Sequence, residues 1–341
     1  MAQGSPWTTD CYNGMPYRFI GNSGLRASNV GLGTWKFGYP DTGDGSRVDE
    51  KTALEILDSA VEIGVTFWDT ANRYNNGTGN SEKIIGKWFK SNPDQRRNIV
   101  LSTKVYGGMD GCTPNHSRLS RSNILDSVYA CLKRLQVEYI DLLYFHAFDP
   151  EIPIEESLLT IEDLVKRDII RYFAVSNFTV AQLSKYKSVQ EKLSSRCKVI
   201  AVQNQFDIVT GENPKYQGVL QYAAESGISF IAWGPLSRGL LTNRYLNIEN
   251  VGPGDRLFDE GSTELYTDNK VREKITRLSS LAKEWNIELN QLALAYMLTL
   301  PGMGPVIPSA STVAQLKSNA EAGKIVLEKS QVERIKEIVN Y

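Results

Sequence analysis

Short runs of β-forming residues alternate with longer amphipathic stretches along most of the chain. The apolar runs cover residues 30–32, 65–68, 99–103, 139–145, 171–175, 199–202, 228–232 and 305–307. After each run, apolar residues recur at helical i, i+3 and i+4 spacings, as over residues 124–135. Strands that alternate with helices indicate a parallel sheet covered on both faces. Eight such units in about 300 residues predict the α/β class and a (β/α)8 barrel.

Three segments fall outside this alternation. Residues 17–28 predict a β-hairpin that covers the floor of the barrel. Residues 235–268, after the seventh predicted strand, are rich in Gly, Pro and Asp and predict a long loop without clear periodicity. Residues 331–341 predict a short terminal helix. We therefore expect one domain over residues 1–341, with its core at about 17–329.

Composition narrows the class of protein. Hydrophobic residues make up 41% of the chain and charged residues 23%, which indicates a folded globular chain rather than a disordered one. The net charge of −1 argues against a general binder of nucleic acid or anionic membranes. No apolar run reaches the length of about 18 residues that a membrane span needs. The start of the chain shows no secretory signal, and the four scattered cysteines resemble reduced thiols, so a cytoplasmic location is expected.

Two familiar site motifs are weak or missing. The run Gly31-Leu32-Gly33 begins like a dinucleotide fingerprint but lacks its third glycine. Only two histidines occur, so no catalytic metal site is expected. The oligomeric state is left open by the sequence.

Polar residues follow the predicted strands directly. They are Asp69, Lys104, His146, Ser176, Asn177, Gln203, Trp233 and Ser309. In a barrel, the loops at the carboxyl ends of the strands carry the chemistry, so these side chains are expected at one mouth. Tyr74 lies five residues after Asp69, close enough to turn back over the same mouth.

This set suits the reduction of a carbonyl group, in which hydride adds to carbon and a proton to oxygen. Tyr74 is the candidate acid, provided that a cation lowers its pKa. Lys104 would supply that cation, and Asp69 would keep Lys104 charged and oriented. His146 would donate a hydrogen bond to the carbonyl oxygen.

Each of these residues also has an ordinary structural interpretation. Taken alone, Asp69 could cap a loop, Lys104 could be solvated, Tyr74 could be a surface or core residue, and His146 could be a buried core histidine. Their joint position at strand ends of one barrel favours a functional role.

The chain resembles the aldo-keto reductase superfamily from Leu25 to about Lys329. The stretches that carry the resemblance are Gly31 to Trp35, Phe67 to Ala71 with Tyr74, Gly79 to Glu82, Ser102 to Lys104, Tyr139 to Leu143 with His146, Val175 to Phe178, Pro235 to Thr242, and Ile307 to Ser311. The family tetrad of Asp, Tyr, Lys and His falls on Asp69, Tyr74, Lys104 and His146.

The resemblance also implies a nicotinamide nucleotide and the residues that hold it. Ser176, Asn177 and Gln203 would bond the carboxamide, and Trp233 would stack on the nicotinamide ring. The pyrophosphate would lie along Leu236, Ser237 and Gly239. The adenosine end would meet Ser311, Gln315 and Asn319, although Gln315 and Asn319 could equally belong to a solvated helix face.

Two departures from the family pattern point to a branch. Ser309 and Gln315 stand where many members have cations, a pattern closer to bacterial general reductases and potassium-channel β-subunits. In the latter branch, basic residues that correspond to Arg244 and Arg256 approach the 2′-phosphate, so we expect NADP(H) to be preferred, with NAD(H) not excluded. The tail after Asn319 is short, which suggests an open pocket and a broad substrate range.

Residues near the strand ends are candidates for substrate contacts. They are Trp35, Tyr39, Trp68, Arg73, Tyr106 and Phe148. Aromatic side chains there would suit aromatic aldehydes and sugar-like rings equally. Arg73 could attract an anionic or polyhydroxylated substrate or could simply be solvated.

The leading hypothesis is an NAD(P)(H)-dependent oxidoreductase that interconverts aldehydes or ketones, including sugar-derived carbonyls, with alcohols. One alternative is a regulatory nucleotide-binding module that resembles a potassium-channel β-subunit, which would keep the same tetrad. Another is a barrel lyase with Lys104 as a Schiff base. In a lyase, however, the set of Ser176, Asn177, Gln203 and Trp233 would have no role.

Overall fold

The computed structural model of the chain describes residues 10–38 and 47–339. A small antiparallel sheet lies at the start, with strands β1 (Cys11–Tyr12), β2 (Met15–Phe19) and β3 (Arg26–Ser28) in that order. Tyr17 pairs with Ser28 and Phe19 with Arg26. The predicted hairpin over residues 17–28 is therefore confirmed.

The turn of this hairpin lies against the amino ends of strands in the main sheet. The Asn22 amide donates to the carbonyl oxygen of Gly227 at 2.8 Å. At Gly21, a side chain would meet the carbonyl oxygen of Ile200 at 2.3 Å, and φ is +54°, so glycine is required there. The hairpin therefore covers the amino-terminal end of the main sheet.

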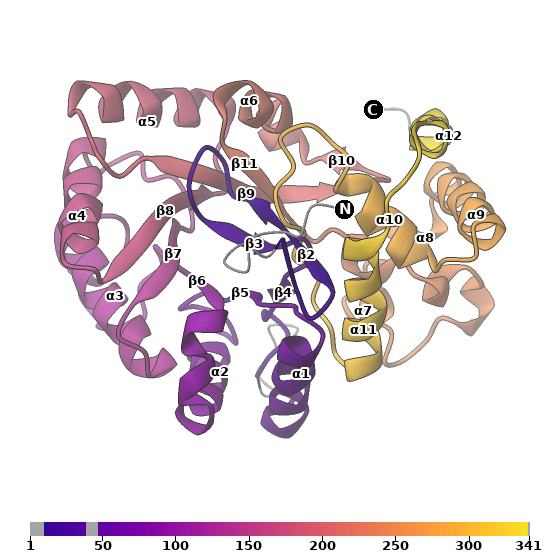
Figure 1. Ribbon diagram of the computed structural model, residues 1–341, viewed down its shortest axis with the longest axis horizontal. Coiled ribbons are helices and arrows are strands. Elements are labelled where there is room, and N and C mark those ends of the chain that lie inside the picture. The colour runs from indigo at the N-terminus through magenta and orange to yellow at the C-terminus, as the bar shows by residue number, and fades with distance from the viewer. Residues whose placement is uncertain (1–9, 39–46, 340–341) are drawn as a thin grey trace, which may run out of the picture.

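A parallel sheet forms the centre of the molecule and curls strongly, with helices around its outer face (Figure 1). Its parallel strands are β4 (Leu32–Gly33), β5 (Phe67–Asp69), β6 (Val100–Val105), β7 (Ile140–Phe145), β8 (Ile170–Ser176), β9 (Val199–Asp207) and β11 (Ser229–Trp233). From β4 to β9 each strand pairs with the next in the chain, and β11 pairs with β9. This arrangement confirms the α/β class.

The segment 302–309 contacts both edges of this sheet. Phe230 of β11 donates its amide to Gly302 at 2.7 Å, and Gly31 donates to Val306 at 2.8 Å. These contacts are isolated bridges, so the strand predicted at 305–307 is not continuous. The reason is chemical, since Pro305 and Pro308 have no amide hydrogen to extend a ladder.

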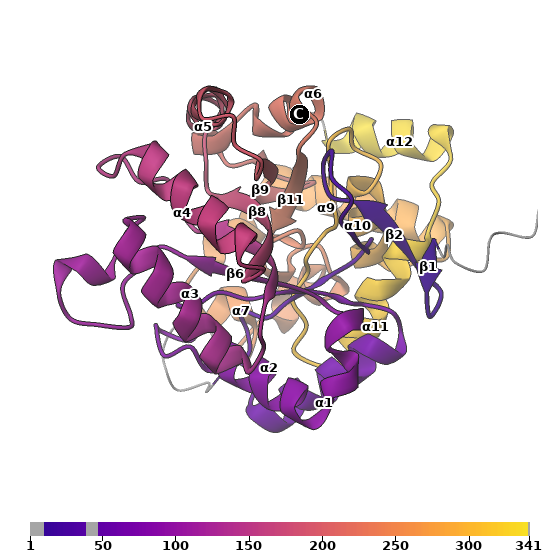
Figure 2. The ribbon, with the colours of Figure 1, turned by 60° about the vertical axis from the view of Figure 1, so that its left-hand side comes forward.

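Helices follow the strands and cover the outer face (Figure 2). They are α1 (Glu50–Glu62), α2 (Asn80–Ser91), α3 (Arg121–Leu135), α4 (Ile154–Lys166), α5 (Val180–Lys192), α6 (Val219–Ser226), α9 (Asn269–Glu284), α10 (Leu289–Met297), α11 (Val313–Glu321) and α12 (Lys329–Val339). Local sequence fixes several starts, because Asp49, Ser120 and Thr179 each accept an amide of the first turn. The terminal helix α12 matches the prediction for that region. Among the described residues, no helix is long and apolar enough to cross a membrane.

Buried apolar side chains form two clusters. The larger one lies between the sheet and the helices. The smaller one fills the inside of the curl, where Ile20 and Ala27 of the hairpin meet Phe67, Leu142 and Ile231 of the strands. The inside of the curl is thus a packed core, and its carboxyl end is left for chemistry.

Two regions differ clearly from the predicted pattern. Strand β9 continues past residue 202, because Gln203 to Gln205 pair with β11 and residues 206–207 pair with β10 (Gly211–Glu212). In the tight turn between β9 and β10, Asp207 accepts the backbone amides of Val209 and Thr210. The segment 235–268 is also more regular than expected, with helices α7 (Arg256–Asp259) and α8 (Thr263–Thr267). Helices α7 and α8 are both shorter than the stretch of sequence over which a helical period can be recognised.

Candidate active site

The four predicted tetrad residues lie at the carboxyl ends of neighbouring strands. Asp69 is the last residue of β5, Lys104 lies near the end of β6, and His146 directly follows β7. Tyr74 lies in the turn after β5, and its backbone N–H donates to the carbonyl oxygen of Ala71. Since β5, β6 and β7 are adjacent, the sheet brings these residues together.

Lys104 is the centre of the cluster. Its Nζ donates to Asp69 Oδ2 at 2.6 Å, to the Thr70 carbonyl oxygen at 2.9 Å, and to the Tyr74 hydroxyl at 2.9 Å. An ammonium has three protons and no acceptor, so all three are used and the Tyr74 oxygen accepts. The phenolic proton of Tyr74 is therefore available for a further acceptor.

Asp69 is held from both sides. Its Oδ1 accepts from Ser102 Oγ at 2.8 Å and from Gln203 Nε2 at 2.9 Å, while Oδ2 faces Lys104. The carboxylate is 2% exposed and Lys104 1% exposed, so the ion pair is buried. The three ammonium protons and both carboxylate oxygens of this buried pair all have hydrogen-bond partners, so the geometry of the pair is well defined.

Charge and burial act against each other in this pair. Burial opposes the charge of Lys104, but Asp69 and Tyr74 outweigh it and raise the pKa of the ammonium. The expected net lowering of the Tyr74 pKa is not found, because burial raises the pKa of the phenol above its ordinary value and the Lys104 cation offsets only part of this effect. Before any ligand binds, Lys104 is therefore protonated and positively charged, and Tyr74 is a protonated, neutral phenol.

His146 lies beside Tyr74, with ring centroids 6.2 Å apart and edge-to-face geometry. Burial, together with the nearby cations Lys104 and Arg73, lowers the pKa of His146 to about 3. At neutral pH the imidazole is therefore uncharged and carries one N–H donor.

Two buried polar residues near the tetrad were not assigned from sequence. Ser102 bonds the carboxylate of Asp69, and Tyr144 lies inside the curl with its ring 5.6 Å from Lys104 Nζ. Ser102 lies two residues before Lys104 on β6, and Tyr144 lies two residues before His146, which directly follows β7. A strand presents every second residue to the same face. That period of two was the available signal.

The residues predicted to hold a carboxamide lie next to the tetrad and contact one another. Ser176 Oγ donates to the carbonyl oxygen of Gln203 at 2.9 Å, and Asn177 Nδ2 donates to that of His146 at 2.9 Å. Trp233 donates its indole N–H to Asn177 Oδ1 at 3.2 Å and is 36% exposed. An accessible indole beside amide groups suits a flat, polar aromatic ring.

The loop after β11 carries the other predicted nucleotide contacts. Leu236, Ser237 and Gly239 form a tight turn there, with positive φ of +48° at Ser237 and +100° at Gly239. Arg244 pairs with Asp255, and Arg256 pairs with Glu260 at 2.7 Å. Both predicted phosphate contacts are therefore paired with carboxylates in this structure.

The residues predicted near the adenosine lie along α11, with Ser311 just before the helix, Gln315 in its first turn and Asn319 near its end. Gln315 accepts the amide of Ser311 at 2.8 Å, and so closes the first turn. Asn319 is buried and accepts from Asn290 Nδ2 at 2.9 Å. Asn319 therefore also joins α10 to α11, a structural contact that the sequence did not suggest.

Three of the candidate substrate residues, Trp35, Arg73 and Tyr106, come soon after the carboxyl ends of strands β4, β5 and β6. Trp35 contacts the Arg256 guanidinium, 4.9 Å from the ring centroid, and Arg73 donates to the Gly108 carbonyl oxygen at 3.0 Å. Tyr106, a third candidate of this group, follows β6 directly and is partly exposed.

Trp68 was assigned wrongly as a substrate contact. It is fully buried on the outer side of β5, bonds the Val65 carbonyl oxygen and packs edge-to-face on Trp88. The reason is strand alternation, which turns Trp68 away from the side that Asp69 faces. Phe148 packs on Phe178, and Tyr39 lies outside the described residues.

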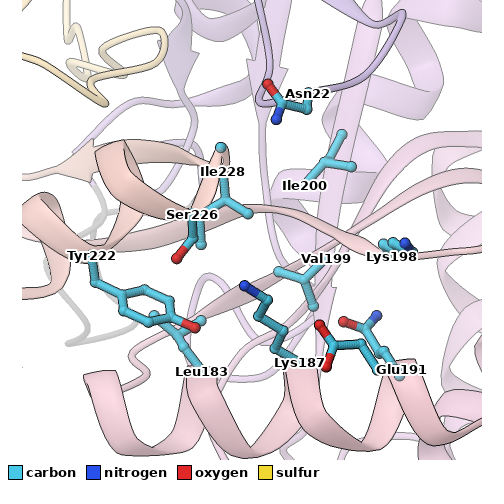
Figure 3. Close-up of a pocket in the computed structure, with 12 residues that line it drawn as sticks. Asn22, Leu183, Lys187, Glu191, Lys198, Val199, Ile200, Tyr222, Ser226 and Ile228 are labelled. Atoms are coloured by element: carbon cyan, nitrogen blue, oxygen red, sulfur yellow. The ribbon is translucent and has the colours of Figure 1, made fainter.

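A cavity of about 320 Å³ lies at the opposite end of the sheet, between α5, α6 and the amino ends of β9 and β11 (Figure 3). Lys187, Tyr222 and Ser226 line it, and it contains none of the predicted site residues. Among residues 10–38 and 47–339, no group of three or more His, Cys, Asp or Glu side chains could hold a metal ion.

Comparison with known proteins agrees with this geometry. The chain is 34% identical to an uncharacterized oxidoreductase, YrpG, of Bacillus subtilis, over 95% of this chain and 96% of the relative. It is 32% identical to the aldo-keto reductase AFTS1 of Alternaria alternata, over 82% and 80%. It is also 29% identical to a probable voltage-gated potassium channel subunit beta of Arabidopsis thaliana, over 92% of each chain.

The sequence profile of the Aldo/keto reductase family matches residues 29–340, which is most of the chain. The resemblance inferred from the sequence motifs is thereby confirmed, and the chain belongs to the aldo/keto reductase family.

Proposed function

We propose that this protein is a nicotinamide-nucleotide-dependent oxidoreductase that interconverts small aldehydes or ketones, including sugar-derived carbonyls, with alcohols. The observation that carries the proposal is the Asp69–Lys104–Tyr74 chain, with contacts of 2.6 and 2.9 Å, beside a neutral His146. Family membership supports an oxidoreductase of carbonyls.

The residues present suit the nucleotide. Trp233 presents a partly exposed indole next to the side-chain amide of Asn177, and Arg244 and Arg256 supply cations in the following loop. A bound nicotinamide nucleotide would supply the hydride that forms the new C–H bond. The two arginines support a preference for NADP(H), because the 2′-phosphate needs cationic donors.

The chain's own residues then handle the proton and the developing charge. Tyr74 gives its phenolic proton to the carbonyl oxygen, so that its O–H bond breaks as the alcohol O–H bond forms. Lys104 already donates to the Tyr74 oxygen and stabilises the phenolate that results. His146, which is neutral, donates its single N–H to the same carbonyl oxygen and fixes its position. Asp69 keeps Lys104 charged throughout.

We also infer that the curled sheet closes as an eight-unit barrel within one domain. The bridges of Val306 to Val30, Ser309 to Gly33, and Met303 to Phe230 support this, because they place one segment between the two edge strands. All of these bridges are parallel, as barrel closure requires.

A panel of aromatic aldehydes, simple ketones and sugar aldehydes, each assayed with NADPH and with NADH, tests the proposed activity. Turnover of at least one carbonyl that is lost in Tyr74→Phe would support it. Nucleotide binding without turnover on the whole panel would overturn it and favour the second candidate, a regulatory nucleotide-binding module. The similarity to the Arabidopsis channel subunit over 92% of the chain is the reason to keep that candidate.

A further inference from the structure

We call the hydrogen-bonded chain of Asp69, Lys104 and Tyr74 the acid relay. Among the residues predicted to bind the nucleotide, all of which the structure describes, Gln203 also bonds this relay. Its Nε2 donates to Asp69 Oδ1 at 2.9 Å, across the inside of the curl from β9 to β5. A carboxylate only accepts, so the amide must present its NH₂ group to Asp69. Gln203 is 2% exposed, which leaves this bond little competition from water.

The backbone of the same residue holds the nicotinamide side of the site. The Gln203 carbonyl oxygen accepts from Ser176 Oγ at 2.9 Å and from the Asn177 amide at 3.0 Å. Asn177 in turn bonds Trp233. The Gln203 side chain also lies beside the Tyr144 hydroxyl, where it offsets part of the rise that burial causes in the pKa of that phenol. Within the described residues, the Gln203 side chain bonds Asp69 through Nε2, which leaves Oε1 to accept from a ligand amide.

We propose that Gln203 is a positioning residue, through which nucleotide binding fixes Asp69 and, through Asp69, the Lys104–Tyr74 pair. This inference rests on the proposed function and adds a physical link between its two halves. When Oε1 accepts from the carboxamide, the amide plane can no longer rotate, and Nε2 is held against Asp69 Oδ1. Asp69 then keeps Oδ2 on Lys104 in the geometry that leaves the Tyr74 proton free.

Two neighbours separate the roles that Gln203 combines. Ser102 donates to the same oxygen of Asp69, at 2.8 Å, but belongs to the acid side only. Trp233 bonds Asn177 and belongs to the nucleotide side only. These two residues therefore supply matched controls, one for each half of the proposal.

The first measurement is the split between kcat, at saturating nucleotide and carbonyl, and the nucleotide Kd. We expect Gln203→Met, which keeps the size but loses the amide, to lower kcat about tenfold or more and also to weaken nucleotide binding. Ser102→Ala should lower kcat and leave Kd unchanged, whereas Trp233→Ala should mainly raise Kd. A Gln203→Met variant that raises Kd alone, as Trp233→Ala does, would overturn the proposal.

The second measurement is a double-mutant cycle with Asp69→Asn. If Gln203 acts through Asp69, Gln203→Met should lower kcat by less than about twofold in the Asp69→Asn background. The reason is that the carboxylate that Gln203 bonds has already been replaced by an amide in that background. Losses that multiply would overturn the proposal while wild-type turnover left the proposed function standing. Absence of both nucleotide binding and carbonyl turnover in the wild type would instead overturn the proposed function, and this inference with it.

Discussion

The tetrad and the loop over residues 235–268 lie at the same end of the sheet but are built differently. Asp69 and Lys104 are almost fully buried on adjacent strands, and each of their polar contacts comes from a strand or the turn beside it. In the loop, the Arg244 side chain is 59% exposed, and both predicted phosphate contacts are held by ion pairs. The Arg256 side chain is 25% exposed, so solvent reaches both arginines of the loop, whereas Lys104 is 1% exposed. Ion pairs that solvent reaches are worth less than fully buried contacts of the same geometry.

This difference suggests a division of tasks. Sheet register sets the distances of the acid relay, so a single change there should be severe. The loop offers cations whose carboxylate partners a phosphate can replace, so changes there should alter nucleotide choice and leave the chemical step intact. Five measurements on variants of both regions test this division.

Tyr74→Phe should lower kcat by about 10²–10⁴-fold, because the phenol is the proposed proton donor. Nucleotide Kd should be unchanged, since the hydroxyl acts mainly in the transition state. Steady-state kinetics and fluorescence titration measure the two quantities. Retention of more than about a tenth of wild-type kcat would show that Tyr74 is not the acid.

Lys104→Met should destabilise the fold by about 3–5 kcal/mol, because it leaves the buried Asp69 carboxylate without its cation. It should also lower kcat, since Tyr74 loses the group that stabilises its phenolate. Urea unfolding gives the free-energy change. The control is Lys324→Met, which removes an exposed pair with Glu321 and should change stability by less than about 1 kcal/mol. Equal effects of the two variants would contradict the contrast drawn above.

The double variant Arg244→Ala/Arg256→Ala should weaken NADP(H) binding by roughly tenfold or more and leave NAD(H) binding unchanged. The reason is that only NADP(H) carries the 2′-phosphate. Affinities for both nucleotides in wild type and variant test this. Arg334→Ala, which removes an exposed arginine paired with Glu284, is the control and should change neither affinity. Equal losses for both nucleotides would show that the arginines do not read the phosphate.

Trp233→Ala should weaken binding of both nucleotides by about two- to tenfold, from a stacking contribution of about 0.5–1.5 kcal/mol. The chemical step at saturating nucleotide should change less than in Tyr74→Phe. If Tm falls while Kd on folded protein stays constant, Trp233 only packs the end of the sheet.

The pH dependence of reduction should be the smallest effect. The pKa of His146 is lowered to about 3, so the imidazole stays neutral at every pH well above that value. Burial raises the pKa of Tyr74 above 10.0, so the phenol stays protonated at every pH well below that value. Between about pH 6 and pH 9 neither group titrates, and kcat at saturating nucleotide should vary less than about twofold. A limb inside this range, absent from a His146→Gln or Tyr74→Phe profile, would show that one of the two pKa directions is wrong.

Sequence alone was enough to predict the α/β class, the hairpin and the family, because these depend on local periodicity and short motifs. It also named Asp69, Tyr74, Lys104 and His146 as one cluster, because every parallel strand brings its carboxyl end to the same edge. Ser102 and Tyr144 were within reach of the same reasoning, through the two-residue period of a strand.

Tertiary structure decided what depends on pairing between distant segments. The partner of Trp68, which is Trp88 of α2, follows from the fold, although the two-residue strand period already turns the Trp68 side chain away from the face of Asp69. The extension of β9 to Asp207 required both β11 and β10 as partners. The bond from Gln203 to Asp69 joins residues 134 positions apart, and no local pattern encodes a contact across the inside of a curled sheet. Sequence thus determined which groups reach the carboxyl end of the sheet, and the curl of the sheet determined which of them touch.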